Sequence, residues 1–334
     1  MNSTFIDNIG ECPAPFQASL LQPESLLPLV IKPSQEDVTF SFLSNWLITN
    51  KIWLEKVLLK HGGILFRGFP IADAVALEGF IHALKLEMFV YRGHSPRPKV
   101  HNQIYVSTEL PSQYAISLHN ELVNTGNPPR KIFFFCQTPA SEGGETPIVD
   151  SRKVYQLMEP QLRDRFITKQ VCYAQNMPNG KDMGILGKSW QTLFETSDRT
   201  LVESYLKDSN IEFDWQPDGS LKTRLIGPAV VTHPATAEPA WHAQAHTLHY
   251  SSFGAALEAM RRLVGEENLP VNTYYGDGTS IDPADVQTIS KLHFNQAILF
   301  HWQQGDVLML DNLLTAHGRQ PFKGERKILV AMTD

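Results

Sequence analysis

The chain has 334 residues, of which 42% are hydrophobic and 19% are charged, and this balance excludes a mainly disordered protein. Its formal net charge of −6 leaves no overall basic footprint, which argues against nucleic acid or an anionic membrane as the main partner. No apolar run approaches the roughly 18 to 20 residues of a membrane span. With three cysteines, no C-x-x-C pair and no signal-peptide pattern, we expect a reduced, cytoplasmic protein.

The N-terminal part divides into two stretches of different character. Residues 1–35 are rich in Pro, Ser and polar residues, and we expect an irregular lead-in. Residues 36–90 show helical periodicity, interrupted by a short apolar run at 64–66 that predicts a buried strand. We expect these N-terminal helices to pack on the core of one domain that spans residues 1–334, with Arg67 as a structural link between the two.

From about residue 100 onward, strand-like runs dominate. They are predicted at 131–136, 145–149, 170–174, 211–215, 229–232, 298–302, 306–310 and 326–332. Helices interrupt them at about 151–167, 198–208, 253–264 and 282–292. Strands without regular β-α alternation argue against a Rossmann or TIM-barrel architecture. They favour a mainly β fold, an antiparallel sandwich or jelly roll with flanking helices.

The stretch SLHNEL, residues 117–122, places His119 and Glu121 two residues apart at the end of a strand-like run. In an extended segment, residues i and i+2 point to the same side. The pair is therefore either half of a metal site or two ordinary polar residues at a strand end.

The C-terminal stretch supplies further polar candidates. The buried run at 306–310 leads into Asp-Asn and then to His317, and Arg326 begins the final strand. Arg326, Ile328 and Val330 share one face of that strand. An arginine among apolar residues is costly to bury without an anion, and a carboxylate matches the guanidinium group well.

His119, Glu121 and His317 together offer two imidazoles and one carboxylate. This ligand set leaves coordination positions open and is the facial triad of non-haem Fe(II) oxygenases, which must admit O2 and a co-substrate. Arg326 would then anchor the far carboxylate of that co-substrate.

At this point the chain resembles the TauD/TfdA (taurine dioxygenase, clavaminate synthase-like) family of Fe(II)/2-oxoglutarate-dependent oxygenases. Five motifs that carry the resemblance stand in family order over roughly residues 60 to 332: GGILFRGFP at 62–70, LHNE at 118–121, GGETPIVDSRKVY at 143–155, WQQGDVLMLDN at 302–312 and HGRQPFKGERKIL at 317–329. The resemblance implies a double-stranded β-helix, a distorted jelly roll. It also implies that 2-oxoglutarate is decarboxylated to succinate and CO2 while an unactivated C–H bond is hydroxylated.

Carried over by position, the resemblance places the Fe(II) ligands at His119, Glu121 and His317. It places the contacts to the 2-oxoglutarate carboxylate at Thr146 and Arg326, with O2 as the remaining co-substrate. Halogenating relatives carry a small residue at the position of Glu121, so this carboxylate favours oxygenation over halogenation.

The substrate pocket is expected to include His94, His242, Gln244 and Val330. Val330 stands where the taurine enzymes carry a sulfonate-binding arginine, so the resemblance favours an amino-acid-like substrate, free or bound to a carrier protein, in natural-product biosynthesis. The alternatives are a catabolic dioxygenase of a small organic acid, or a non-catalytic protein of the same fold that binds a metal or small acid.

One other cluster resembles a metal site by its spacing. The run WHAQAHTLHY contains His242, His246 and His249, which would share one face of a helix. It lacks the glutamate of an H-E-x-x-H motif. We interpret these histidines as pocket lining or packing, with a metal site as the alternative.

Overall fold

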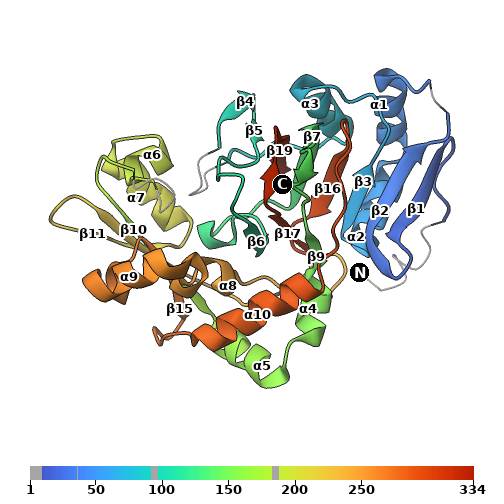
Figure 1. Ribbon diagram of the computed structural model, residues 1–334. Coiled ribbons are helices and arrows are strands. Elements are labelled where there is room, and N and C mark those ends of the chain that lie inside the picture. Colours follow the sequence, from blue (N-terminus) through green and yellow to red (C-terminus); the bar gives the residue numbers. More distant parts are fainter. Residues whose placement is uncertain (1–9, 36, 92–96, 183–187) are drawn as a thin grey trace.

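The structure is a computed structural model that describes residues 10–35, 37–91, 97–182 and 188–334 (Figure 1). Its largest sheet has eight strands in the order β1-β2-β3-β16-β7-β19-β5-β4, and of its pairs only β2 with β3 is parallel. In that order the strands are Phe16–Gln22, Ser25–Pro33, Gly63–Phe66, Val307–Asp311, Lys131–Thr138, Lys327–Thr333, Ile104–Val106 and Lys99–His101. The central strands therefore come from the middle and the C-terminal end of the chain.

A smaller three-stranded sheet has the order β6-β17-β9, formed by Ile116–His119, Thr315–Arg319 and Ile148–Asp150. Two short pairs complete this part: β8 (Glu142–Gly143) with β18 (Phe322–Lys323), and β13 (Val230–Thr232) with β14 (Pro239–Trp241). The prediction of a mainly β fold with antiparallel sheets and flanking helices is confirmed.

The side chains of β7 alternate between two cores, as the pleat of a strand requires. Phe133 and Phe135 pack toward the N-terminal helices α1 (Phe40–Thr49), α2 (Lys51–His61) and α3 (Ala74–Ala83). Phe134 belongs to the opposite, inner core, which also contains Ile148 and Val330. The large sheet is thus buried on both faces, which explains why its central strands read as nearly continuous apolar runs.

The remaining strands and helices form the part on the left and along the lower edge of Figure 1. A four-stranded sheet has the order β11-β12-β10-β15, formed by Glu212–Trp215, Leu221–Gly227, Val171–Met177 and Val271–Tyr275. The helices α4 to α10 are Ser151–Leu157, Pro160–Lys169, Trp190–Phe194, Arg199–Asp208, Ala245–Leu248, Gly254–Val264 and Pro283–Asn295. Single 3-10 turns are η2 (Val123–Thr125), η4 (Tyr250–Phe253) and η5 (Glu266–Asn268). Within the described residues, no helix is long and apolar enough to cross a membrane.

Two arginines join segments that are far apart in the sequence. Arg67 directly follows β3 and is partly buried; it forms an ion pair with Asp306 at 2.7 Å and donates to the carbonyl of His301. Arg152 pairs with Asp150 and donates to the last carbonyls of α2, those of Leu59 and Lys60. The arginines of the ILFRGFP and VDSRKVY motifs are therefore structural links between distant segments. For Arg67, this role agrees with the prediction from the sequence.

The expected irregular lead-in is wrong for the described part of residues 1–35. There β1 and β2 form a hairpin, and β2 adds in parallel to β3. The apolar run at 26–31 explains this hairpin, because its residues 27 to 31 are buried. Pro28 suggests a break in the sequence, but β2 continues through it and pairs with β1 and β3 on either side. The strand expected at 298–302 is also wrong, because Ile298 forms only an isolated bridge with Ile148.

Candidate metal centre and co-substrate site

His119 and His317 lie side by side on adjacent strands of the small sheet. They are direct register partners of β6 and β17, and their ring centroids lie 4.5 Å apart. The Oε2 atom of Glu121 lies 3.4 Å from Nε2 of His317 and 3.9 Å from Nε2 of His119. The three potential ligand atoms all lie within 4.8 Å of one another, so the group could hold a metal ion.

Glu121 is not held by the strand that carries His119. Strand β6 ends at His119, so the alternation of an extended segment does not extend to Glu121. Instead, the backbone N–H of Glu121 donates to Oδ1 of Asn312 at 2.7 Å, and Nδ2 of Asn312 donates back to the Glu121 carbonyl at 3.0 Å. The next residue, Leu122, has a left-handed backbone with φ of 57°, a conformation that costs free energy and turns the chain sharply after the carboxylate.

The protonation states suit a divalent cation. Burial, reinforced by the neighbouring His317, lowers the pKa of His119 to about 4, so its imidazole is neutral at physiological pH. Burial by itself opposes ionisation of Glu121, but Arg97 and the two imidazoles outweigh it and hold the pKa of this carboxyl far below its usual range. Metal binding needs a neutral imidazole and an ionised carboxylate, and both are present without a change of pH.

His119 is also oriented toward the ligand group. Its Nδ1–H donates to the carbonyl of Ser117 at 2.8 Å, which leaves the lone pair on Nε2 toward Glu121 and His317. Two imidazoles and one carboxylate on one side of a cavity fit Fe(II), because three further positions stay open.

Thr146 and Arg326 lie together at another wall of the same cavity. The Oγ1 atom of Thr146 accepts from Nε1 of Trp302 at 3.1 Å and from Nη2 of Arg326 at 3.5 Å. Since a hydroxyl has two acceptor sites, its proton remains available for a bound carboxylate. Burial lowers the pKa of Arg326 to about 10, which still leaves the guanidinium charged near neutral pH.

A glycine allows this arrangement. Nε of Arg326 donates to the carbonyl of Gly144 at 2.9 Å, and a Cβ atom on Gly144 would lie 2.9 Å from Cδ of Arg326. Gly144 also has a positive φ of 73°, so both its backbone and its missing side chain are needed here. The GGET motif therefore positions Arg326 as well as supplying Thr146.

His119, His317, Thr146 and Arg326 line one cavity. Its wall combines the two imidazoles and Thr146 with three arginines and several apolar side chains: Arg97, Ser107, Thr108, Ile116, His119, Phe134, Thr146, His317, Gly318, Arg319, Arg326 and Ile328. Arg319 donates to the carbonyls of Leu110, Pro111 and Tyr114, and so holds the loop that precedes β6.

The residues expected to contact substrate are not brought together at this cavity. Gln244 donates its side-chain amide to the carbonyl of Asn120 and so supports the backbone beside Glu121. His242 is buried against the loop at Ala229, and Val330 is part of the inner core. His94 lies outside the described residues.

The histidines of the WHAQAHTLHY run form no metal site within the described residues, where only His119, Glu121 and His317 cluster suitably. Nε2–H of His246 donates to the carbonyl of Leu118 at 2.8 Å, and its ring stacks on His293 at 4.1 Å. The interpretation as packing residues is confirmed for His246, which supports the strand that carries His119.

Two residues at the site were not predicted. Arg97 donates from Nη2 to both carboxylate oxygens of Glu121, at 3.1 and 3.0 Å. Arg97 lies in a polar loop, and nothing in the spacing of residues around it distinguishes it from an ordinary surface arginine. Asn312 stands in an Asp-Asn pair that reads as an ordinary turn, and its pairing with Glu121 is set only by the fold.

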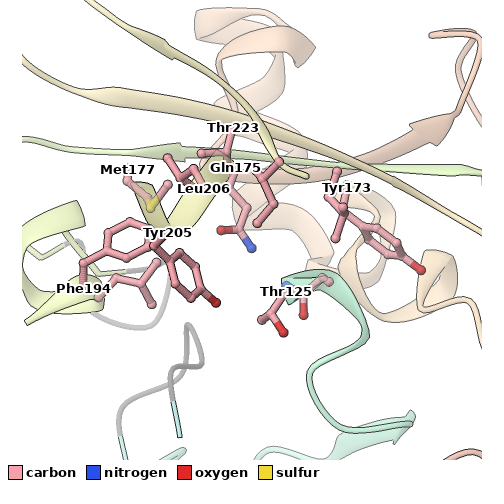
Figure 2. A pocket seen from close by; sticks show the side chains of 12 residues that line it. Thr125, Tyr173, Gln175, Met177, Phe194, Tyr205, Leu206 and Thr223 are labelled. Atoms are coloured by element: carbon pink, nitrogen blue, oxygen red, sulfur yellow. The ribbon is translucent and has the colours of Figure 1, made fainter. Parts of the chain in front are cut away.

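A second cavity lies between β10, α6, α7 and the turn η2, which follows Glu121 closely in the chain (Figure 2). Figure 2 shows the side-chain amide of Gln175 directed into it, with Thr125 and Tyr205 at its sides. Its other walls are largely apolar: Met177, Leu193, Phe194, Leu206, Ile211 and Leu225.

Comparison with known proteins identifies the family. The profile of the family described as "Taurine catabolism dioxygenase TauD, TfdA family" matches residues 25–333. The chain belongs to this family. It is 33% identical over 283 residues to the dapdiamide synthesis protein DdaC of Enterobacter agglomerans, which covers 84% of each chain. It is 29% identical over 318 residues to a clavaminate synthase-like protein of Arabidopsis thaliana, covering 91% of this chain and 93% of the relative.

Solved structures of other proteins share the fold. PvcB of Pseudomonas aeruginosa aligns with a TM-score of 0.54 and 16% identity, covering 100% of this chain and 94% of PvcB. AAD-2, solved with Mn(II) and N-oxalylglycine, aligns with a TM-score of 0.55 and 13% identity over 95% of this chain and 96% of AAD-2. The predicted distorted jelly roll is thereby confirmed. As a member of the TauD/TfdA family, the chain is a non-haem iron dioxygenase that uses Fe(II), 2-oxoglutarate and O2.

Proposed function

We propose that this dioxygenase hydroxylates an unactivated C–H bond of an amino-acid-like substrate, free or bound to a carrier protein, in natural-product biosynthesis. The observation that carries the proposal is the His119–Glu121–His317 group at one cavity with Thr146 and Arg326. Residues 1–334 act as a single oxygenase domain. His119, Glu121 and His317 bind Fe(II), and Thr146 and Arg326 bind the distal carboxylate of 2-oxoglutarate.

Each group has a separate task. Fe(II), when bound, supplies the activation of O2 and the oxidation of the C–H bond, which no side chain can perform. The two imidazoles and Glu121 would hold the ion as three ligands. Arg326 donates N–H groups to the carboxylate while Thr146 adds its hydroxyl proton, so the co-substrate enters in one orientation. The apolar side chains of Ile116, Phe134 and Ile328 limit water in the cavity.

The substrate class is supported by the relatives and by one residue. The relative at 33% identity is named as a dapdiamide synthesis protein, which fits the biosynthesis of an amino-acid-derived product. Val330, where the taurine enzymes have an arginine, is fully buried in the inner core and offers no charge to a sulfonate.

The proposal is tested in two stages. Anaerobic addition of Fe(II) and 2-oxoglutarate should produce a visible charge-transfer absorption, which His119→Ala and Glu121→Ala should abolish. An unchanged absorption in both variants would refute the ligand assignment. With O2 admitted, free amino acids, small peptides and carrier-bound amino acids are then screened for substrate-dependent release of succinate. Stimulation by small organic acids of catabolism alone would instead support the catabolic alternative.

A further inference from the structure

Arg97 is a buried arginine at the metal group whose bonding is incomplete. Its side chain is 8% exposed, and its Cζ atom lies 4.5 Å from the centre of the Tyr91 ring. Among the described residues, only Nη2 has an acceptor, the carboxylate of Glu121. Within the described part of the chain, Nε and Nη1 are buried without any hydrogen-bond partner. Three of the five N–H bonds of a guanidinium are therefore unsatisfied, which is costly in a buried site.

The charges at the cavity show what is missing. Arg97, Arg319 and Arg326 contribute three positive charges to its wall. Fe(II), Glu121 and doubly charged 2-oxoglutarate together carry one negative charge, so the loaded site keeps an excess positive charge before any substrate enters. A buried charge without a counter-charge is unfavourable, so this site favours an anion.

The three arginines are not equivalent. Both Nη atoms of Arg319 are taken by backbone carbonyls of the loop before β6, so only its Nε is unpaired among the described residues. Arg326 stands with Thr146, where the proposed function places 2-oxoglutarate. Arg97 alone among these three combines direct contact with Glu121 and unused buried donors. The ring of Tyr91 beneath it keeps the guanidinium in place, so the donors are held ready for a ligand.

We propose that Arg97 binds a free carboxylate of the substrate, so that the preferred substrate is a free acid. This inference rests on the proposed function, since it specifies the substrate of that same site. It favours the free substrate over the one bound to a carrier protein. A carrier-bound amino acid is a thioester and has lost the carboxylate that Arg97 would bind. Arg97 is thus a specificity-determining residue. Because Arg97 contacts the metal ligand Glu121, a substrate carboxylate bound by Arg97 would lie close to the metal.

The test measures binding without turnover. Protein saturated anaerobically with Fe(II) and 2-oxoglutarate is titrated calorimetrically with the common L-amino acids, with short carboxylic acids and with the matched primary amides. For the acid that binds best, we expect an affinity at least about tenfold above that of its amide. Arg97→Gln should weaken the acid about thirtyfold or more and leave the amide unchanged. Arg97→Lys, which keeps the charge, should recover part of the loss.

The controls separate this role from a structural one. Arg262→Gln removes an exposed arginine of α9 and should change neither affinity. Thermal unfolding and the charge-transfer absorption report whether Arg97→Gln still folds and binds iron with 2-oxoglutarate, and we expect 2-oxoglutarate affinity to change less than about threefold. Equal binding of acids and amides, or loss of 2-oxoglutarate affinity as large as the loss of acid affinity, would overturn the inference. So would a panel in which no acid binds.

The same data distinguish failure of the proposed function. If only carboxylic acids without an amino group bind, and do so through Arg97, the anchor stands and the amino-acid substrate class is wrong. If amino acids stimulate succinate release only as amides or thioesters, the proposed hydroxylase stands and the role of Arg97 is wrong.

Discussion

Asn312 and Glu121 are 191 residues apart in sequence and are joined by two reciprocal hydrogen bonds, side chain to backbone in both directions. Asn312 is fully buried at the end of β16 and also donates to the carbonyl of Pro129. One amide side chain thus fixes the chain on both sides of the turn that contains Glu121. The carboxylate at the metal group is therefore placed by the large sheet, whereas the two imidazoles are placed by the small one.

Asn312→Ala should lower the affinity for Fe(II) or Mn(II) by about tenfold to a hundredfold, because an outer residue that orients a ligand is removed. Titration calorimetry with the metal measures this. Asn176→Ala is the matched control, since Asn176 likewise donates to the carbonyls of Glu267 and Leu269 but lies in β10. Both variants should lose stability of the order of 1 to 3 kcal/mol, but only the first should lose metal affinity. Equal metal affinities would show that Glu121 is positioned without Asn312.

Gly144→Ala should weaken 2-oxoglutarate binding by about tenfold or more. The added Cβ would lie 2.9 Å from Arg326 Cδ and displace the guanidinium that we propose as the carboxylate anchor. The readout is anaerobic titration of 2-oxoglutarate, followed by the charge-transfer absorption.

Gly278→Ala provides the control for backbone strain. Gly278 also has a positive φ, of 83°, but a Cβ there meets nothing within 4 Å. Both alanine variants should lose a similar stability of about 1 kcal/mol from the left-handed backbone. If Gly278→Ala impaired 2-oxoglutarate binding as much as Gly144→Ala, the close approach to Arg326 would not be the cause.

Thr146→Val should also weaken 2-oxoglutarate by about tenfold, since a hydrogen bond to a charged group contributes roughly 1.5 to 3 kcal/mol. It removes the hydroxyl proton and also leaves Nε1 of Trp302 without its acceptor. Thr146→Ser keeps the hydroxyl and should bind within about threefold of the native protein. The same titration measures both variants, and a serine variant as weak as the valine variant would show that the methyl group matters instead.

Acid should destabilise the protein through its buried histidine pair. Burial lowers the pKa of His293 to about 4, and burial together with His293 lowers the pKa of His246 well below its ordinary value. Between about pH 6.5 and 4 the unfolded chain therefore binds protons that the folded chain does not. The free energy of unfolding must fall as the pH drops through this window, by about 1.4 kcal/mol per pH unit for each such histidine.

His293→Gln should make that dependence shallower by about one histidine's share between pH 6 and 4.5, as measured by urea unfolding at several pH values. His82→Gln is the control, because His82 is exposed on α3. Parallel curves for native protein and His293→Gln would exclude the pair as a source of acid sensitivity.

The runs at 131–136, 306–310 and 326–332 were predicted as strands and form β7, β16 and β19, with boundaries shifted by a residue or two. The hairpin of β1 and β2 was missed because a proline and polar neighbours hid an apolar run that pairs with distant β3. The run at 298–302 alternates apolar and exposed residues as a strand would, but among the described residues only Ile298 of this run pairs with another segment. The sequence of one segment does not show whether a partner strand lies beside it.

The sequence by itself determined the residue types of the site and their order along the chain. An H-x-E pair and a distant histidine suggested a site for iron, and Arg326 suggested an anchor for a carboxylate. The resemblance of five ordered motifs to the TauD/TfdA family then implied 2-oxoglutarate as the co-substrate. Tertiary structure decided how they meet: the register of β6 with β17, the support of Glu121 by Asn312 and the unsatisfied donors of Arg97. These depend on contacts between residues far apart in sequence, and burial and hydrogen-bond satisfaction exist only once such segments pack together.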